Sequence, residues 1–313
     1  NANNKELDEQ YPDMNDGERA ERICENYGLP FSIFRSPEEM KGIEDLSGEG
    51  NRTIRVIERE NGQKAFLRLF DDMMKFPSEA EMAVTFKRFT MKLPKVGFLT
   101  GHGERSIDSD RAKDYLFFSQ LKNFRYSLIN QGFDTEALSL ADGRTIPEEI
   151  SILVIADPRE KLTEWEKSEI NRYIASGRHL LIAAKPGRQA ILNEITEPLG
   201  VHFTDGILVH PSEDFAPDLI QGRFTPDAES FSGNLAYLSR NNYRITAPGT
   251  AGILCHLPEG FGMLPLVVTD SVGNWNEKET TDFVNEVLEF APEKGDEEWN
   301  GQPIVLAMGR HIG

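Results

Sequence analysis

Short apolar runs alternate regularly with helical segments between residues 95 and 201. Four runs have the length and composition of strands, at 95–101, 133–140, 150–156 and 179–184. A capping box formed by Thr163 and Glu166 opens a helix between the last two runs, and Gly177 closes it. Because parallel neighbours need a long crossover, usually a helix, this alternation predicts a doubly wound, mostly parallel α/β sheet.

The composition of the runs also predicts where some strands lie. Residues 150–156 and 179–184 are apolar on both faces, as strands between two covering layers must be, so we expect both to be central. Between Phe117 and Leu128 apolar residues recur at helical spacing and predict an amphipathic helix. Later apolar segments predict further strands in the sheet or beside it, at 243–247, 252–257, 264–269 and 303–308.

A smaller unit is predicted before the sheet. Residues 1–20 are polar and acidic, and we expect a loose N-terminal arm there. Residues 21–92 form the expected small α/β domain. Its clearest element is a hairpin at 53–70, in which Asn61-Gly62 favours a type I′ turn.

The main domain is expected to span residues 93–313. Pro94 marks its start, and a chain of 313 residues is long enough for about two domains. Residues 211–242 are rich in Pro, Asp, Ser, Asn and Gly with weak periodicity, so we expect an irregular excursion there.

The charge balance excludes some partners. The chain has 34 Lys and Arg against 52 Asp and Glu, a net charge of -18, which opposes binding to nucleic acid or to anionic lipid.

No apolar run approaches the roughly 18 residues of a membrane-spanning helix. The two cysteines, Cys24 and Cys255, lack metal-site spacing but leave one long-range disulfide open.

Candidate ligand or partner residues stand in the loops that follow the strands. In an open doubly wound sheet, ligands bind beyond the carboxyl ends of the strands, where the winding direction reverses. Three loops meet that description, at 100–105, 157–160 and 185–188, and under a 2-1-3-4-5 strand order the first two are neighbours. The candidate residues are Thr100, His102, Glu104, Arg105, Asp157, Arg159 and Lys185.

The chemistry of these loops has a functional and a structural interpretation. His102 and Glu104 have the groups to bind a metal or to move a proton. The favoured interpretation is a structural turn, in which the two side chains satisfy loop amides or pair with Arg105 or Arg159. A nucleotide phosphate is disfavoured because Glu104 and Asp108 place negative charge on the loop. We therefore assign no cofactor and no metal.

The sequence gives no support for covalent catalysis. It contains no G-x-S-x-G or G-x-C-x-G elbow, and the turn after residues 179–184 has the sequence Lys185-Pro186-Gly187. Cys255 and His256 are adjacent on a predicted strand and so point to opposite faces. We predict no catalytic residue and a protein that is not an enzyme.

Two stretches carry a resemblance to a known family. KVGFLTGHGER at 95–105 and IPEEISILVIADPREKLTEWEKSEINRYIASGRHLLIAAKPGRQAILNEITEPLGV at 146–201 resemble the extracytoplasmic region of the gliding-motility GldG family. These proteins are auxiliary components of bacterial ABC transporters of the ABC-2 type, commonly from Bacteroidetes. PLVVTDSVGNWNE at 265–277 is also similar to a segment of that family.

This resemblance implies a fold and a role. The fold is a sheet domain similar to class I glutamine amidotransferases and flavodoxin, without the amidotransferase nucleophile, after a domain that is partly thioredoxin-like. The role is non-catalytic binding or scaffolding on the periplasmic side, with the permease and ATPase subunits as partners and an unknown small-molecule ligand. Family members have flanking membrane helices, so we expect a soluble fragment of an anchored protein. The family's G-H-G-E implies a structured loop at Gly101, His102, Gly103 and Glu104.

Two other functions stay open. One is a hydrolase-like enzyme or a carbohydrate-binding protein that uses the loops at 100–105 and 157–160. The other is a cytosolic flavodoxin-like signalling module, which would bind a ligand phosphate at the first loop.

Overall fold

The computed structural model describes residues 5–49, 54–70, 72, 74, 76–183 and 185–310. The chain divides into two compact units, residues 1–56 and 57–313. The first unit contains three short helices, α1 (Lys5–Gln10), α2 (Asp16–Asn26) and α3 (Pro37–Ile43). Single turns of 3-10 helix lie in both units: Phe31–Ile33, Ser47–Glu49, Leu128–Asn130, Ala141–Gly143, Glu197–Leu199 and Pro292–Lys294.

The N-terminal segment is more regular than the loose arm predicted for residues 1–20. The side chain of Asn15 accepts a hydrogen bond from Glu18 N, and the Glu18 carboxylate accepts one from Asn15 N, which starts α2. Arg19 donates to the carbonyl of Tyr11 at 3.0 Å and forms an ion pair with Asp8. Local capping of this kind gives a polar segment helical structure without a core. Residues 1–4 lie outside the described residues.

The hairpin forms where it is predicted, but its turn differs. Strands β1 (Ile54–Glu58) and β2 (Lys64–Arg68) pair in a two-stranded sheet. Arg59 N donates to Gln63 O and Gly62 N donates to Arg59 O, both at 2.9 Å, so three residues form the loop. The two-residue type I′ turn is therefore wrong. Gly62 has a φ of +81°, the left-handed conformation that ends three-residue hairpin loops.

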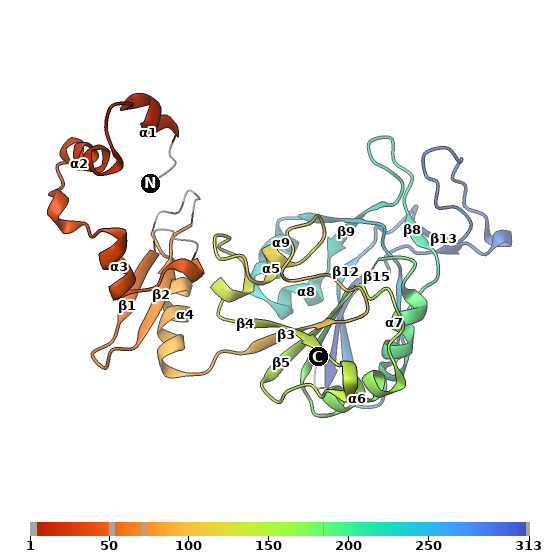
Figure 1. The fold of residues 1–313 in the computed structure, drawn as a ribbon. Coiled ribbons are helices and arrows are strands. Elements are labelled where there is room, and N and C mark those ends of the chain that lie inside the picture. The colour runs from red at the N-terminus through yellow and green to blue at the C-terminus, as the bar shows by residue number, and fades with distance from the viewer. Residues whose placement is uncertain are drawn as a thin grey trace. The chain divides into compact units, whose positions relative to one another are not determined.

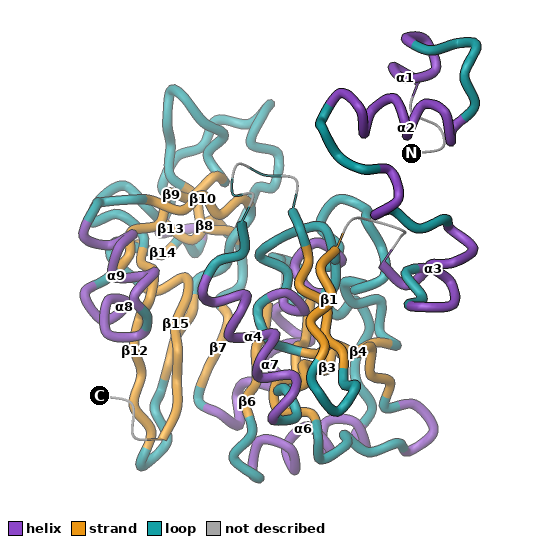
Figure 2. The backbone as a smooth tube through the Cα atoms, turned by 90° about the vertical axis from the view of Figure 1, so that its left-hand side faces the viewer, coloured by secondary structure: helices purple, strands orange, loops and turns teal. Residues whose placement is uncertain are grey.

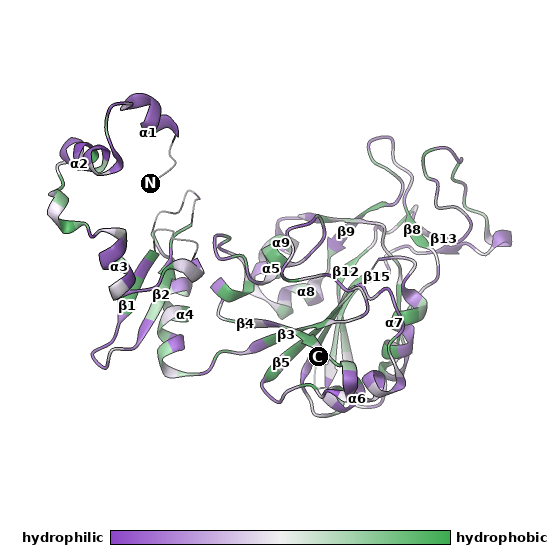
Figure 3. Cartoon of the chain, viewed as in Figure 1, coloured by the Kyte–Doolittle hydropathy of each residue, from purple (hydrophilic) through white to green (hydrophobic). Residues whose placement is uncertain are grey.

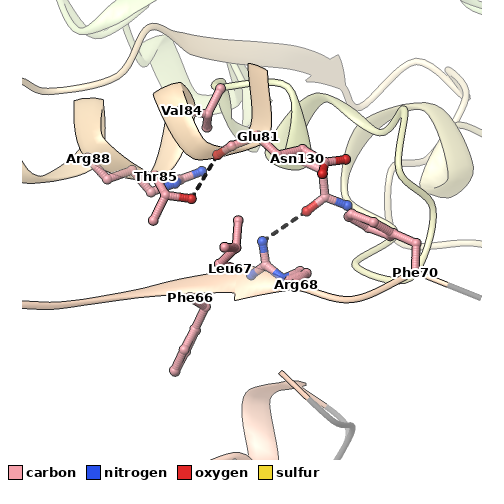
Figure 4. Close-up of a pocket in the computed structure, with 9 residues that line it drawn as sticks. All are labelled: Phe66, Leu67, Arg68, Phe70, Glu81, Val84, Thr85, Arg88 and Asn130. Atoms are coloured by element: carbon pink, nitrogen blue, oxygen red, sulfur yellow. Dashed lines mark hydrogen bonds between the residues drawn. The ribbon is translucent and has the colours of Figure 1, made fainter. Parts of the chain in front are cut away.

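Helix α4 (Glu79–Thr90) begins at the capping box of Ser78 with Glu81, and it belongs with the second unit. The division after residue 56 thus differs from the predicted start of the main domain at residue 93. Long-range polar contacts explain why the segment before residue 93 belongs with the second unit. Buried Arg125 holds Asp72 at 2.7 Å and also contacts Glu81. Arg68 donates to Asn130 Oδ1 at 3.0 Å (Figure 4).

The centre of the second unit is a parallel sheet of four strands in the order β4-β3-β5-β6 (Figure 1). These strands are β3 (Lys95–Thr100), β4 (Asp134–Ser139), β5 (Ile150–Ala156) and β6 (His179–Ala183). The α/β fold class is confirmed, and so is the order expected for the first four strands. The winding reverses between β3 and β5. Strand β6 lies at the hydrogen-bonded edge, so its predicted central position is wrong.

The sheet is covered on both faces. Leu99, Leu153 and Ile155 face a cluster that includes residues of α6 (Glu164–Ala175) and α7 (Gln189–Thr196). Alternate residues such as Phe98 and Val154 face the opposite cluster, which includes Ile107. Figure 3 shows β3 and β5 as apolar, in contrast to the polar α1 and α2. Apolar strands therefore form the middle layer, as buried parallel strands do.

One predicted helix is replaced by irregular chain. Between β3 and β4 the structure has only α5 (Leu116–Ser119) and a 3-10 turn that ends at Asn130. The Asn130 amide nitrogen donates to the carbonyl of Phe124 at 2.8 Å, the carbonyl of Lys122 at 3.3 Å and Ser127 Oγ at 3.0 Å. These bonds satisfy carbonyls that a continuous helix would have satisfied with its own amides.

The C-terminal strands form separate sheets. The largest is antiparallel, in the order β10-β9-β12-β15, with β12 and β15 as long neighbouring strands (Figure 2). Two smaller antiparallel sheets pair β11 with β7 and arrange β14-β13-β8. The strands are β7 (Val201–Phe203), β8 (Ile207–Val209), β9 (Leu219–Phe224), β10 (Arg244–Pro248), β11 (Ile253–Cys255), β12 (Phe261–Val268), β13 (Trp275–Glu277), β14 (Glu297–Glu298) and β15 (Pro303–Arg310).

The excursion predicted as irregular at 211–242 contains regular structure. It holds β9 and two helices, α8 (Pro226–Phe231) and α9 (Gly233–Arg240). Thr225 and Ser232 accept hydrogen bonds from the first turns of these helices. The polar residues that indicate a loop are thus N-caps, a position that favours the same residue types. Both cysteines are free thiols.

Candidate functional site

The loops after β3 and β5 lie side by side at the point where the winding reverses. Arg159 N donates to His102 O at 2.7 Å, and Arg105 N donates to Ala156 O at 2.9 Å. The predicted adjacency of these two loops is therefore confirmed. Parallel strands bring their carboxyl ends to one edge, so the loops that follow neighbouring strands meet there.

His102 lies between two buried carboxylates. Its backbone N donates to Glu104 Oε2 at 2.7 Å, and its Nδ1 lies 3.1 Å from Glu104 Oε1. On the other side of the ring, Nε2 lies 3.1 Å from Glu166 Oε2. All three side chains are at most 10% exposed. The Gly-His-Gly-Glu turn is thus held by its own histidine and by a helix.

Glu166 is a residue of this cluster that the spacing of the loops does not reveal. It stands in the first turn of α6, and its Oε2 also accepts hydrogen bonds from Thr163 N and Thr163 Oγ1, both at 2.8 Å. Burial alone would raise the pKa of Glu166, but the hydrogen bonds from Thr163 and the nearby His102 ring lower it overall. The capping box is visible in the sequence, whereas the contact with His102 has no local signal.

A second polar cluster is centred on Asp157. Its carboxylate forms an ion pair with Arg105, and its Oδ1 accepts a hydrogen bond from Lys185 N at 3.4 Å. Asp157 itself has a φ of +55°, and its N donates to Ala183 O at 2.7 Å. The loop after β6 thereby joins the other two. The predicted turn offered loop amides, Arg105 and Arg159 as partners for His102 and Glu104. In the structure Glu104 is bonded to His102, and Arg105 pairs with Asp157.

The two remaining candidate residues are Thr100 and Arg159. Thr100 Oγ1 donates to Leu138 O at 3.3 Å, which ties it to the neighbouring strand β4. The aliphatic part of Arg159 packs on Gly103, where an added Cβ would lie 3.2 Å from Arg159 Cδ. Gly103 has a φ of +73°, so glycine is favoured there both by conformation and by space.

The arrangement is that of an internally bonded polar turn. Across the described parts of the chain, no group of three or more His, Cys, Asp or Glu side chains is arranged to hold a metal ion. His102 is bonded to Glu104 within the loop and to Glu166 in the first turn of α6.

A small pocket lies elsewhere in this unit, between β2 and α4 (Figure 4). Its volume of about 20 Å³ is room for about one water molecule. The arginine side chains that line it are already bonded, Arg68 to Asn130, and Arg88 to Asp134 Oδ1 and Ile129 O, each at 3.0 Å. This pocket is a packing feature between segments.

Comparison with known proteins gives one family. Residues 93–225 match the model of a family described as "ABC-type uncharacterized transport system". The match supports an auxiliary component of an ABC-type transport system, and it spans β3 to β9, including all the loops described above. No curated protein has significant similarity to the chain.

Two solved structures are distantly similar. One is described as "mmIFT52 N-terminal domain", with 16% identity, a TM-score of 0.42, and coverage of 60% of this chain and 82% of that one. The other is a glutamine amidotransferase from Thermotoga maritima, with 11% identity, a TM-score of 0.34, and coverage of 60% and 73%.

The helices were also compared with what a bilayer requires. Within the described ranges, none is both long enough and apolar enough to cross a membrane.

Proposed function

We propose that this chain is a non-catalytic binding or scaffolding domain of a membrane-anchored auxiliary component of a bacterial ABC transporter. The observation that carries the proposal is the family match over residues 93–225. We further propose that the component is of the GldG kind, that the domain lies on the periplasmic side, and that its partners are the permease and ATPase subunits. These finer points are supported by the sequence resemblance at 95–105 and 146–201.

The polar groups at the sheet edge support a role without covalent chemistry. His102 has a carboxylate at each ring nitrogen, and Asp157 is occupied by Arg105 and by the backbone of Lys185. The sequence contains no nucleophile elbow. A general base must be able to reach a substrate proton, whereas His102 is buried and already bonded on both sides.

The partner assignment is tested by purification from the bacterium that encodes the chain. The native gene is tagged at its own locus, membranes are extracted with a mild detergent, and co-purifying proteins are identified by mass spectrometry against an untagged strain. We expect permease and ATPase subunits of one ABC transporter to be enriched. Enrichment of neither subunit would contradict the proposal.

Two further measurements separate the other assignments. Protease added outside spheroplasts should degrade a periplasmic domain and leave a cytosolic one intact. For catalysis, the purified chain is tested against amide, ester and glycosidic substrates. Turnover that is lost in both His102→Ala and Glu104→Ala, while circular dichroism shows both variants folded under the assay conditions, would establish the hydrolase instead.

A further inference from the structure

Basic side chains converge on one carboxylate at the edge where the winding reverses. Asp157 pairs with Arg105, its Oδ1 lies 4.0 Å from Arg188 Nε, and the backbone amide of Lys185 donates to the same oxygen at 3.4 Å. The three basic residues come from the loops after β3 and β6, which lie at the carboxyl ends of the strands. This is the position at which open α/β sheets bind ligands.

A fourth cation lies beside them. The neighbouring Lys113 lowers the pKa of Lys185, and burial and Arg105 add to this, while Asp157 partly opposes it. Two ammonium groups at close range repel each other, so this arrangement costs free energy unless an anion lies nearby. Lys113 also has a φ of +79°, a conformation that is unfavourable for lysine.

One hydrogen-bond donor of the cluster lacks an acceptor among the residues that the structure describes. This donor is the buried Nε of Arg188, and the Asp157 Oδ1 at 4.0 Å is too far away for a hydrogen bond. Arg188 is also the N-cap residue of α7, and it provides no side-chain hydrogen bond to the first turn of that helix. A buried guanidinium N–H that makes no hydrogen bond favours a negatively charged oxygen nearby.

The acidic side chains of the first loop are bonded to other residues. The sequence disfavours phosphate because Glu104 and Asp108 stand on that loop. In the structure the Glu104 side chain is only 1% exposed and is bonded to His102, and Asp108 accepts a hydrogen bond from Gln120. Of the other carboxylates, Asp114 lies near Arg105 and is held by Ser109 and by Ser106 N.

We propose that Arg105, Lys113, Lys185 and Arg188 form a binding site for a phosphate group at the carboxyl ends of β3, β5 and β6. Four basic side chains thus lie near two carboxylates, Asp157 and Asp114, in a chain whose net charge is -18. A local excess of positive charge in an acidic protein attracts an anion to that place and away from the rest of the surface. The proposal does not rest on the transport assignment, because phosphate binding requires no partner protein.

The test is calorimetric titration of the full chain with inorganic phosphate at constant ionic strength. We expect binding by the wild-type chain, and a loss of about tenfold or more in affinity in both Lys185→Gln and Arg188→Gln, since each removes a charge-assisted hydrogen bond. Lys294→Gln is the matched control, because Lys294 is an exposed lysine paired with Glu279 far along the chain. Its affinity should equal that of the wild type.

A second arm uses vesicles of phosphatidylglycerol. Vesicle binding that is lost in Lys185→Gln and Arg188→Gln would identify a lipid headgroup as the source of the phosphate, whereas binding of inorganic phosphate alone would identify a soluble ligand. An independent readout is the Lys185 Nζ signal in NMR, whose pKa should rise when phosphate is added. The site is ruled out if neither probe binds, or if both variants bind as the wild type does.

Discussion

His102 Nε2 lies 3.1 Å from Glu166 Oε2, although 64 positions separate the two residues in the chain. This contact joins the loop after β3 to the first turn of α6. The Gly-His-Gly-Glu turn, whose residue types also occur in catalytic sites, is here bonded to a helix that covers the sheet.

Replacement of His102 should destabilise the fold. His102→Ala leaves the buried carboxylates of Glu104 and Glu166 without their shared ring partner. We expect the free energy of unfolding to fall by about 2–4 kcal/mol, because removal of the ring leaves buried carboxylate oxygens without a hydrogen-bond partner. Urea denaturation of the full chain measures this. His202→Ala is the control, since the His202 side chain is 43% exposed, and it should change stability by less than about 0.5 kcal/mol.

The stability of the domain should depend on pH through Glu166. Although burial raises its pKa, the hydrogen bonds from Thr163 and the His102 ring lower it below the ordinary value of 4.5. The stabilisation is therefore fully present above about pH 4.5 and is lost as the pH falls through the lower folded pKa. Glu166→Gln should flatten the acid limb of an unfolding free-energy profile.

The matched control for that profile is Glu164→Gln in the same helical turn. The Glu164 side chain is 91% exposed, so its removal should leave the acid limb unchanged. If Glu166→Gln and the wild type lose stability in parallel below pH 4.5, the carboxylate has no part in the acid response.

Tyr173 should resist ionisation in alkali. Burial raises its pKa to about 12 from 10.0, and its hydroxyl donates to His179 O at 2.8 Å. The resulting stabilisation is complete below pH 10 and is lost as the pH rises towards the folded pKa. Ultraviolet titration should show one tyrosine ionising last, and Tyr173→Phe should remove that step. Tyr126→Phe, at a side chain that is mostly exposed, should leave it in place.

Replacement of Arg125 by lysine should destabilise the fold. Its Nε and Nη2 hold both oxygens of Asp72 at 2.7 and 2.9 Å, and its guanidinium lies 4.6 Å above the ring of Phe70. Lysine can reproduce neither the paired hydrogen bonds nor the planar stacking. We expect Arg125→Lys to lower the free energy of unfolding by about 1–3 kcal/mol. It should also speed hydrogen exchange in α4.

For comparison, Arg240→Lys changes an arginine that is 70% exposed and paired only at its edge with Glu229. It should alter stability by less than about 0.5 kcal/mol. Equal effects of the two substitutions would mean that Arg125 does not hold α4 in place.

Much of the fold could be predicted from the sequence because its signals are local. The capping box at Thr163 marked where α6 begins, and the wholly apolar run at 150–156 marked β5. Each of these signals depends on residues within a few positions of one another. The 2-1-3-4-5 strand order was an assumption, and the structure shows it for the first four strands, with the loops at His102 and Asp157 side by side.

Local signals also misled where polar side chains bond the nearby backbone. The apolar spacing between Phe117 and Leu128 favours a helix, but the Asn130 amide bonds carbonyls of this segment. Thr225 and Ser232 have loop-like composition and act as caps. Side-chain hydrogen bonds to the backbone can thus either replace a helix or start one.

Most strands and helices of the parallel sheet, and the chemistry available at its loops, could be predicted from the sequence. Which side chains meet could not: Glu166 with His102, Lys113 with Lys185, and Arg188 with Asp157. These residues are far apart in the chain and come together because the loops and helices pack at one edge of the sheet. The charge and burial of the side chains at the strand ends are therefore known only from the folded structure, in which Glu104 is buried and the basic side chains lie at the edge of the sheet.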